Sequence, residues 1–219
     1  MVDAVVFDMD GVIVDTESYW IEEERAILDE ALPEGHDVDP LDITGINVHD
    51  QYEMLSAEYD MRLGPEEYFD RFDERAARVY ERADLLPEFH ALLDDLRSRN
   101  VPVGVCTSSY PRWIDIVFDS HDLEGRFDEV LSAASLDAPG KPEPDIYETM
   151  AERLHVDPAA MVVVEDSENG VAAAAAAGAY TVAYGAHAHD GIDYSPADEV
   201  VETPEDLRER LLALVDGSV

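Results

Sequence analysis

Two aspartates end the first apolar run of the chain, in the stretch VVFDMDGVIVDT at residues 5–16. Asp8 follows the run directly, Asp10 comes two positions later, and Gly11 ends the regular extension. Because side chains alternate along an extended chain, Asp8 and Asp10 are expected on the same side. Ligands of open α/β sheets bind outside the carboxyl ends of strands, so the pair is a candidate for carboxylate chemistry. The simpler interpretation is a strand-end aspartate followed by an Asp-Gly turn.

A second pair of acids ends another apolar run, in MVVVEDSENG at residues 161–170. Glu165 and Asp166 close the run, and a helix is expected to start near Ser167. Together with the first pair, these acids could bind a cation. Alternatively, Asp166 or Ser167 merely caps the helix.

Hydroxyl groups end a third run, in VPVGVCTSS at residues 101–109. Thr107, Ser108 and Ser109 stand just before Pro111, which is expected to open a helix. Hydroxyls and free N–H groups at a helix N-terminus suit an anion, usually phosphate. An ordinary helix cap explains the same residues in isolation.

If the three strands belong to one sheet, the residues at their ends lie near one another and can form a single site. Two like charges at about 4 Å repel by about 4 kcal/mol at an effective dielectric of about 20. A divalent cation removes most of that cost, and hard carboxylate oxygens favour Mg²⁺. An anionic substrate needs a fixed cation as well. Lys141, on the loop after the strand expected at 128–133, can provide it, and it is the only lysine in the chain.

Apolar runs alternate with helical patterns from residue 100 onward. Strands are expected at 4–7, 101–106, 128–133, 161–166, 180–184 and 198–201. Helices are expected at 111–120, 143–154, 168–178 and from Thr203–Pro204 to about Val215. This alternation predicts an α/β fold, a Rossmann-like parallel sheet with helices on both faces.

Residues 16–85 follow a different pattern. Three amphipathic segments fill them, with no convincing strand, which predicts an all-helical insertion after the first strand. We expect Pro87 to start the helix that returns to the sheet. The expected domains are an α/β core of residues 1–15 and 86–219 and a helical cap of residues 16–85.

The chain carries 52 Asp and Glu against 14 Lys and Arg, a formal net charge of −38. Such a balance argues against nucleic acid and anionic membranes as partners. A disordered acidic protein is excluded by the 46% of hydrophobic residues spread along the chain. Interspersed acids and near-absence of lysine indicate a halophilic protein, because molar salt shortens the screening length to about 3 Å.

No run of 18 apolar residues exists, and the first residues carry no basic leader. We therefore expect a soluble, cytoplasmic protein. The single cysteine, Cys106, allows no internal disulfide and is expected in the core. A monomer or a weak homodimer is expected.

Four motifs taken in order resemble the haloacid dehalogenase superfamily, specifically its phosphohydrolases. They are DMDGV at 8–12, the strand end at Thr107, GKPEPDIY at 140–147 and VVVEDSENG at 162–170. The match covers nearly the whole chain. The helical insertion resembles the small cap that closes over the site in one subclass of this superfamily.

The resemblance implies a role for each motif residue. Asp8 would be the nucleophile that takes the phosphoryl group, and Asp10 the general acid and then the general base. Mg²⁺ would be held by the carboxylates of Asp8 and Asp166 and the backbone carbonyl of Asp10, with Glu165 acting through water or orienting these ligands. The phosphoryl group would be bound by Thr107, the Ser108 backbone N–H and Lys141.

Departures from sister activities narrow the expected reaction. Dehalogenases lack the second acid, Asp10, and phosphonate hydrolases use a cap lysine, which residues 16–85 do not contain. Trp20 and Val48 stand where similar sugar phosphomutases carry a histidine and an arginine. We therefore expect Mg²⁺-dependent hydrolysis of a small phosphorylated metabolite.

Several questions stay open at this stage. A phosphomutase and a non-catalytic binding protein of the same fold remain alternatives. Phosphoglycolate and sugar phosphates both remain candidate substrates. His187 and His189 stand in a Gly-containing loop, where we expect solvated side chains rather than a metal site.

Overall fold

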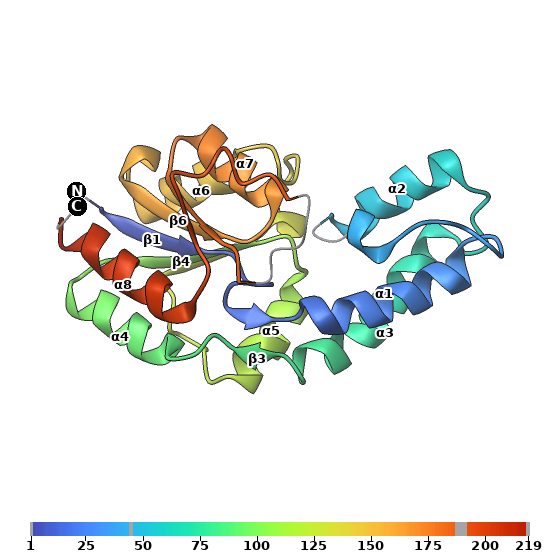
Figure 1. The fold of residues 1–219 in the computed structure, drawn as a ribbon, viewed down its shortest axis with the longest axis horizontal. Helices are drawn as coiled ribbons and strands as arrows, with labels where there is room; N and C mark the ends of the chain where they lie inside the picture. The colour runs from blue at the N-terminus through green and yellow to red at the C-terminus, as the bar shows by residue number, and fades with distance from the viewer. Residues whose placement is uncertain (1, 44–45, 187–191, 218–219) are drawn as a thin grey trace.

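The computed structural model describes residues 2–43, 46–186 and 192–217. Its main sheet has six parallel strands, with β1 (Ala4–Phe7) inside it (Figure 1). The strand order across the sheet is β5 (Glu129–Ser132), β4 (Val103–Thr107), β1, β6 (Met161–Glu165), β7 (Tyr180–Tyr184) and β8 (Glu199–Val201). The parallel α/β sheet predicted from the sequence is confirmed.

Helices cover both faces of this sheet (Figure 1). Helices α6 (Asp145–Leu154) and α7 (Glu168–Ala177) pack together on one face, and α4 (Phe89–Ser98) and α8 (Pro204–Val215) on the other. Alternate residues of β1 supply the two cores: Val5 and Phe7 join the α4 and α8 side, and Ala4 and Val6 the α6 and α7 side. This two-sided burial explains why the strand is an unbroken apolar run.

Strand β1 lies where the order of connections reverses. The chain continues from β1 through the insertion to β4 and β5 on one side, then crosses to β6, β7 and β8 on the other. A crevice at such a switch point, at the carboxyl ends of the strands, is where open α/β sheets bind ligands. Helix α5 (Pro111–Ser120) begins shortly after β4. The core also contains two 3-10 turns, η2 (Ala133–Ser135) and η3 (Pro158–Ala160).

The insertion after β1 is a helical body that extends from one end of the sheet (Figure 1). It contains α1 (Glu17–Ala31), η1 (Pro40–Asp42), α2 (Val48–Glu58) and α3 (Pro65–Tyr80). The chain passes from the core into the insertion and back through two short segments. These segments pair as antiparallel strands, β2 (Val14–Asp15) and β3 (Asp84–Leu85). That this body is a separate cap domain with the boundaries given above remains a proposal.

Two sequence expectations at this junction are wrong. The insertion was expected to contain no strand, yet β3 pairs with β2, because two residues are too few to show a periodic pattern. Helix α4 begins at Phe89 rather than at Pro87. Glu88 has a left-handed backbone with φ of 58°, so the chain turns once more before the helix starts.

Within the described residues, none of the helices combines the length and apolarity needed to cross a membrane.

Candidate active site

The loop after β1 brings Asp8 to the carboxyl end of the sheet. The Asp8 backbone N–H donates to the Val164 carbonyl on β6, 2.9 Å away, so the strand pairing extends to this residue. Its side chain is buried, with the residue 6% exposed. Gly11 follows with φ of +77°, and a Cβ there would stand 1.7 Å from Asp166 Oδ2. Only glycine lets the two loops approach this closely.

Lys141 connects the first and last motifs. Its ammonium Nζ lies 2.5 Å from Asp8 Oδ1 and 2.5 Å from Glu165 Oε1, and it donates to the Cys106 carbonyl at 3.1 Å. The side chain is only 4% exposed. Burial alone would lower the pKa of Lys141, but the two carboxylates outweigh it and raise that pKa. Lys141 therefore stays a buried cation at the strand ends.

Glu165 is fully buried and receives donors on both oxygens. Oε1 accepts from Lys141 and, at 2.6 Å, from the Tyr147 hydroxyl, and Oε2 accepts from Ser167 Oγ at 3.1 Å. A Cβ on Gly170 would lie 2.0 Å from this carboxylate. Residue 170 in the first turn of α7 must therefore be glycine for Glu165 to sit there.

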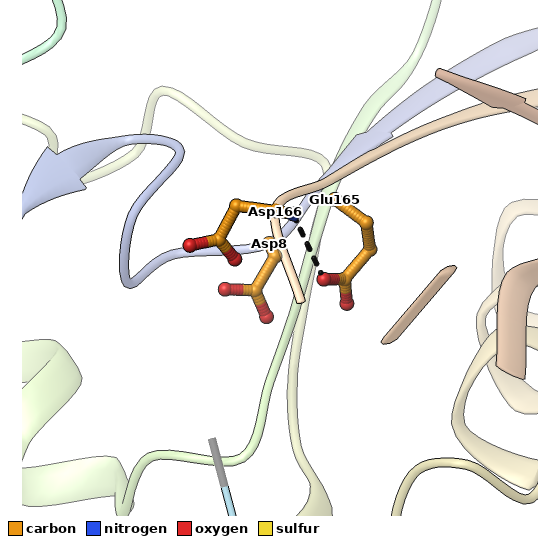
Figure 2. Close-up of side chains that lie close together, drawn as sticks. All are labelled: Asp8, Glu165 and Asp166. Atoms are coloured by element: carbon orange, nitrogen blue, oxygen red, sulfur yellow. Dashed lines mark hydrogen bonds between the residues drawn. The ribbon is translucent and has the colours of Figure 1, made fainter. Parts of the chain in front are cut away.

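The carboxyl groups of Asp8, Glu165 and Asp166 lie close together (Figure 2), and those of Asp8 and Glu165 contact the Lys141 ammonium. Oxygens of Asp8, Glu165 and Asp166 lie within 4.8 Å of one another. Burial raises the pKa of Asp8 to about 8 against the opposing effect of Lys141, and it raises the pKa of Asp166 well above its usual range. When all three groups are ionised, the single positive charge of Lys141 does not balance their negative charge. A further cation would lower the repulsion between them, and their hard oxygen donors suit Mg²⁺.

Asp10 lies in a cage of hydroxyl groups. Thr16 Oγ1 donates to its Oδ1 at 2.9 Å, and Ser109 Oγ and the Tyr80 hydroxyl lie 2.7 and 3.3 Å from its Oδ2. The Tyr80 and Ser109 hydroxyls are also 2.8 Å apart. Burial raises the pKa of Asp10, while these hydroxyls oppose the shift. Thr16 follows β2 at the start of the insertion, and Tyr80 ends α3 near its close. The hydroxyl groups around Asp10 therefore join the insertion to the core.

Hydroxyl residues form the opposite side of the site, between β4 and α5. Thr107 is buried at the end of β4, and its Oγ1 accepts the Ser109 N–H at 3.0 Å. Ser132 Oγ donates to the Ser109 carbonyl at 2.7 Å, which fixes the loop from the neighbouring strand. Helix α5 begins at Pro111, as expected, shortly after Thr107 and Ser108 in the chain.

These groups open into a cavity of about 430 Å³ between the core and the insertion. The core residues that line it include Asp8, Asp10, Thr107, Ser108, Lys141 and Asp166. The lining residues from the insertion include Trp20, Glu24, Val48 and Phe72.

The structure brings every predicted site residue to this cavity or its margin; their catalytic roles stay predictions. Sequence reasoning missed Tyr147, Thr16 and Tyr80. Tyr147 lies inside the GKPEPDIY motif and could have been found from it, whereas nothing in the local sequence of Tyr80 indicates a contact 70 residues away. Cys106 is buried, as expected, and His187 and His189 lie outside the described residues.

Fold and site together describe an α/β protein with a candidate active site at a strand switch point. A model of haloacid dehalogenase-like hydrolases matches residues 2–178, and the chain belongs to this family. The resemblance seen in the four motifs is thereby confirmed.

Named relatives include both phosphatases and phosphomutases. The chain is 32% identical to a phosphorylated carbohydrates phosphatase of Thermotoga maritima over 80% of this chain and 82% of that protein. It is 30% identical to β-phosphoglucomutase of Bacillus subtilis over 95% and 93%. The crystal structure of β-phosphoglucomutase from Clostridium difficile superposes with a TM-score of 0.78 at 24% identity, covering 100% of this chain and 98% of that one, which supports the fold.

Proposed function

We propose that the protein is a Mg²⁺-dependent phosphatase that hydrolyses a small phosphate monoester through an aspartyl-phosphate on Asp8. The observation that carries this proposal is the contact of Asp8 with Lys141, beside an Asp10 carboxyl held by three hydroxyls. A nucleophile, a fixed cation and a proton donor within one cavity are what phosphoryl transfer requires. The phosphatase relative gives independent support.

In the first step Asp8 attacks the phosphorus, and the bond to the ester oxygen breaks. Asp10 gives its proton to the departing alkoxide. Its raised pKa suits this role, because a general acid works best with a pKa near the working pH. Lys141 and the hydroxyl of Thr107 would hold the phosphoryl oxygens, with the Ser108 backbone N–H beside them.

In the second step water attacks the phosphorus of the aspartyl-phosphate, and Asp10 takes up the proton of that water. The phosphorus–Asp8 bond breaks, phosphate leaves, and the Asp8 carboxylate is restored. The cage of Thr16, Tyr80 and Ser109 keeps the Asp10 carboxyl in place for both proton transfers.

Mg²⁺ would be bound by the carboxylates of Asp8 and Asp166 and the Asp10 backbone carbonyl, and when bound it neutralises charge on the phosphoryl group. Glu165 already has both oxygens engaged by protein donors, which supports an orienting role rather than direct binding. Glu165 instead holds Lys141 against Asp8.

The test is phosphate release from p-nitrophenyl phosphate with Mg²⁺, with and without EDTA. We expect EDTA to abolish release and added Mg²⁺ to restore it. Asp8→Asn should remove activity with an unchanged melting curve, because an amide is a poor nucleophile and a weaker Mg²⁺ ligand. Full activity of Asp8→Asn would refute the assignment, and no release under any condition would favour a non-catalytic protein of this fold.

A phosphomutase is the second candidate, supported by the similarity to β-phosphoglucomutase over most of both chains. It differs in a measurable way, because it would convert glucose 1-phosphate into glucose 6-phosphate without net phosphate release. Assaying both products from β-glucose 1-phosphate separates the two reactions.

A further inference from the structure

Tyr147 is the last residue of the GKPEPDIY stretch, and no step of the proposed reaction uses it. It lies in the first turn of α6 and is fully buried. Its hydroxyl donates to Glu165 Oε1 at 2.6 Å, and the Lys141 ammonium lies 2.5 Å from the same oxygen. A carboxylate only accepts hydrogen bonds, so the phenol is the donor. The stretch therefore supplies two donors to one carboxylate oxygen.

The Lys141 ammonium has three N–H groups, and each has a protein acceptor. The acceptors are Asp8 Oδ1 at 2.5 Å, Glu165 Oε1 at 2.5 Å and the Cys106 carbonyl at 3.1 Å. A phosphoryl oxygen that binds Lys141 must share or displace one of them. The Cys106 carbonyl belongs to β4, and Asp8 is the proposed nucleophile. How strongly Glu165 holds the ammonium therefore decides how freely Lys141 can serve the phosphoryl group.

The Tyr147 hydroxyl weakens the hold of Glu165 on the ammonium. A donor close to an anionic oxygen neutralises part of the charge that attracts a second donor. Glu165 is 0% exposed, so a lost donor would leave Oε1 without a replacement from bulk water. Without the hydroxyl, Oε1 would attract the Lys141 ammonium more strongly and draw it away from Asp8.

The ring of Tyr147 makes a separate contact with Lys141. Lys141 Nζ lies 5.4 Å from the ring centroid, within the distance of about 6 Å at which an aromatic face attracts a cation. Phenylalanine keeps this ring and lacks only the hydroxyl. Tyr147→Phe therefore isolates the hydrogen bond to Glu165 from the contact of the ring.

We propose that Tyr147 is a positioning residue for phosphoryl transfer, whose hydroxyl holds Glu165 Oε1 so that the Lys141 ammonium is shared with Asp8 and the phosphoryl group. Tyr147 is not among the residues that line the cavity, so it acts through Glu165 and Lys141. This inference rests on the proposed phosphatase function and adds a residue to its machinery.

The single lysine of the chain gives a direct measure of this effect. Protein made with [ζ-¹⁵N]lysine gives one side-chain ammonium signal by NMR, which belongs to Lys141. In EDTA-treated protein, Tyr147→Phe should shift this signal and change the exchange of its protons with water. With Mg²⁺ restored, kcat on p-nitrophenyl phosphate should fall at least about tenfold, as expected for a lost hydrogen bond to a charged group. A melting curve checks that the variant is folded.

Tyr180→Phe is the matched control. The Tyr180 hydroxyl accepts from Arg210 Nη2 at 3.3 Å and lies beside Glu199, so it too belongs to a cluster of an acid and a base. Tyr180 is on β7 and does not line the cavity. Its variant should leave both the Lys141 signal and kcat unchanged. A purely structural effect of losing a hydroxyl would not move the signal of the folded protein.

Two outcomes would overturn this inference while the phosphatase proposal stands. In one, Tyr147→Phe shifts the Lys141 signal but keeps wild-type turnover, so the position of the ammonium does not limit the reaction. In the other, turnover falls and the signal stays in place, so the hydroxyl does not act through Lys141. Absence of phosphate release by the wild type is a different result, and it would overturn the proposed function and this inference together.

Discussion

Lys141 is the single lysine of the chain, and its ammonium lies 2.5 Å from each of two carboxylates. An ammonium is a compact charge, whereas a guanidinium is a broad planar fork that does not fit between Asp8 and Glu165. We therefore expect Lys141→Arg to reduce kcat by about 10²-fold or more, although the formal charge is unchanged. Phosphate-release kinetics beside a melting curve measure this, and near wild-type turnover would contradict the role given to the ammonium.

Asp10→Asn tests the proton donor separately from the nucleophile. The amide oxygen can accept the Thr16 hydrogen bond and the amide NH₂ can donate to the Ser109 hydroxyl, but the amide cannot give a proton to an alkoxide. Turnover of alkyl phosphates should fall by about 10²–10⁴-fold, and that of aryl phosphates much less, because their leaving groups need little protonation. An equal loss on both kinds of ester would argue against a general acid at position 10.

The motif residues could be predicted because each follows an apolar strand directly, so sequence position alone indicates the sheet edge. The hydroxyl groups around Asp10 could not be predicted in this way. Tyr80 ends an amphipathic helix and reads as an ordinary core residue, yet its hydroxyl reaches Asp10 and Ser109. Such a contact depends on how the insertion packs on the core, which no local pattern encodes.

At the scale of elements, the start of α7 decides whether Glu165 can support Lys141. Gly170→Ala would normally favour a helix by about 1 kcal/mol. Here the new Cβ would meet the Glu165 carboxylate at 2.0 Å, and that carboxylate is held by Lys141, Tyr147 and Ser167. We expect a net loss of about 1–3 kcal/mol in the free energy of unfolding, together with lower turnover.

Gly140→Ala is the matched control for this change. Gly140 precedes Lys141, its φ is not in the left-handed region, and a Cβ there has no heavy atom within 4 Å. Denaturant unfolding should therefore show a lower free energy of unfolding for Gly170→Ala than for Gly140→Ala. Stabilisation by Gly170→Ala would mean that Glu165 moves away at little cost.

The order of the core elements could be predicted, since runs of apolar residues and helix start signals such as Pro111 and Pro204 are local. The junction between the insertion and the core was predicted less accurately. Strand β3 has only two residues, and the left-handed Glu88 moves the start of α4 past Pro87. Strand β3 forms by pairing with β2, which lies about 70 residues earlier in the chain, so no local pattern indicates it.

At the scale of the whole molecule, the arginines are distributed as bridges within an acidic surface. Arg99 pairs with Asp216, 2.9 Å away, and Arg126 with Asp94, 2.7 Å away. With 52 acids against 14 bases, most carboxylates have no such partner available. The compact state must therefore bear repulsion between like charges that these bridges only partly offset.

That repulsion makes stability depend on salt, which is how the halophilic character predicted from composition can be tested. Raising KCl from about 0.1 M to about 3 M shortens the screening length from about 10 Å to below about 3 Å. The melting temperature should rise because unpaired acids of the folded state then repel one another less. Concentrated salts can also strengthen apolar burial, so a chaotropic sodium salt at equal ionic strength is the control. Screening alone predicts stabilisation by both salts at concentrations below about 0.5 M, before effects on burial become large. A melting temperature that stays constant over that range would mean that the −38 charge does not limit the stability of this fold.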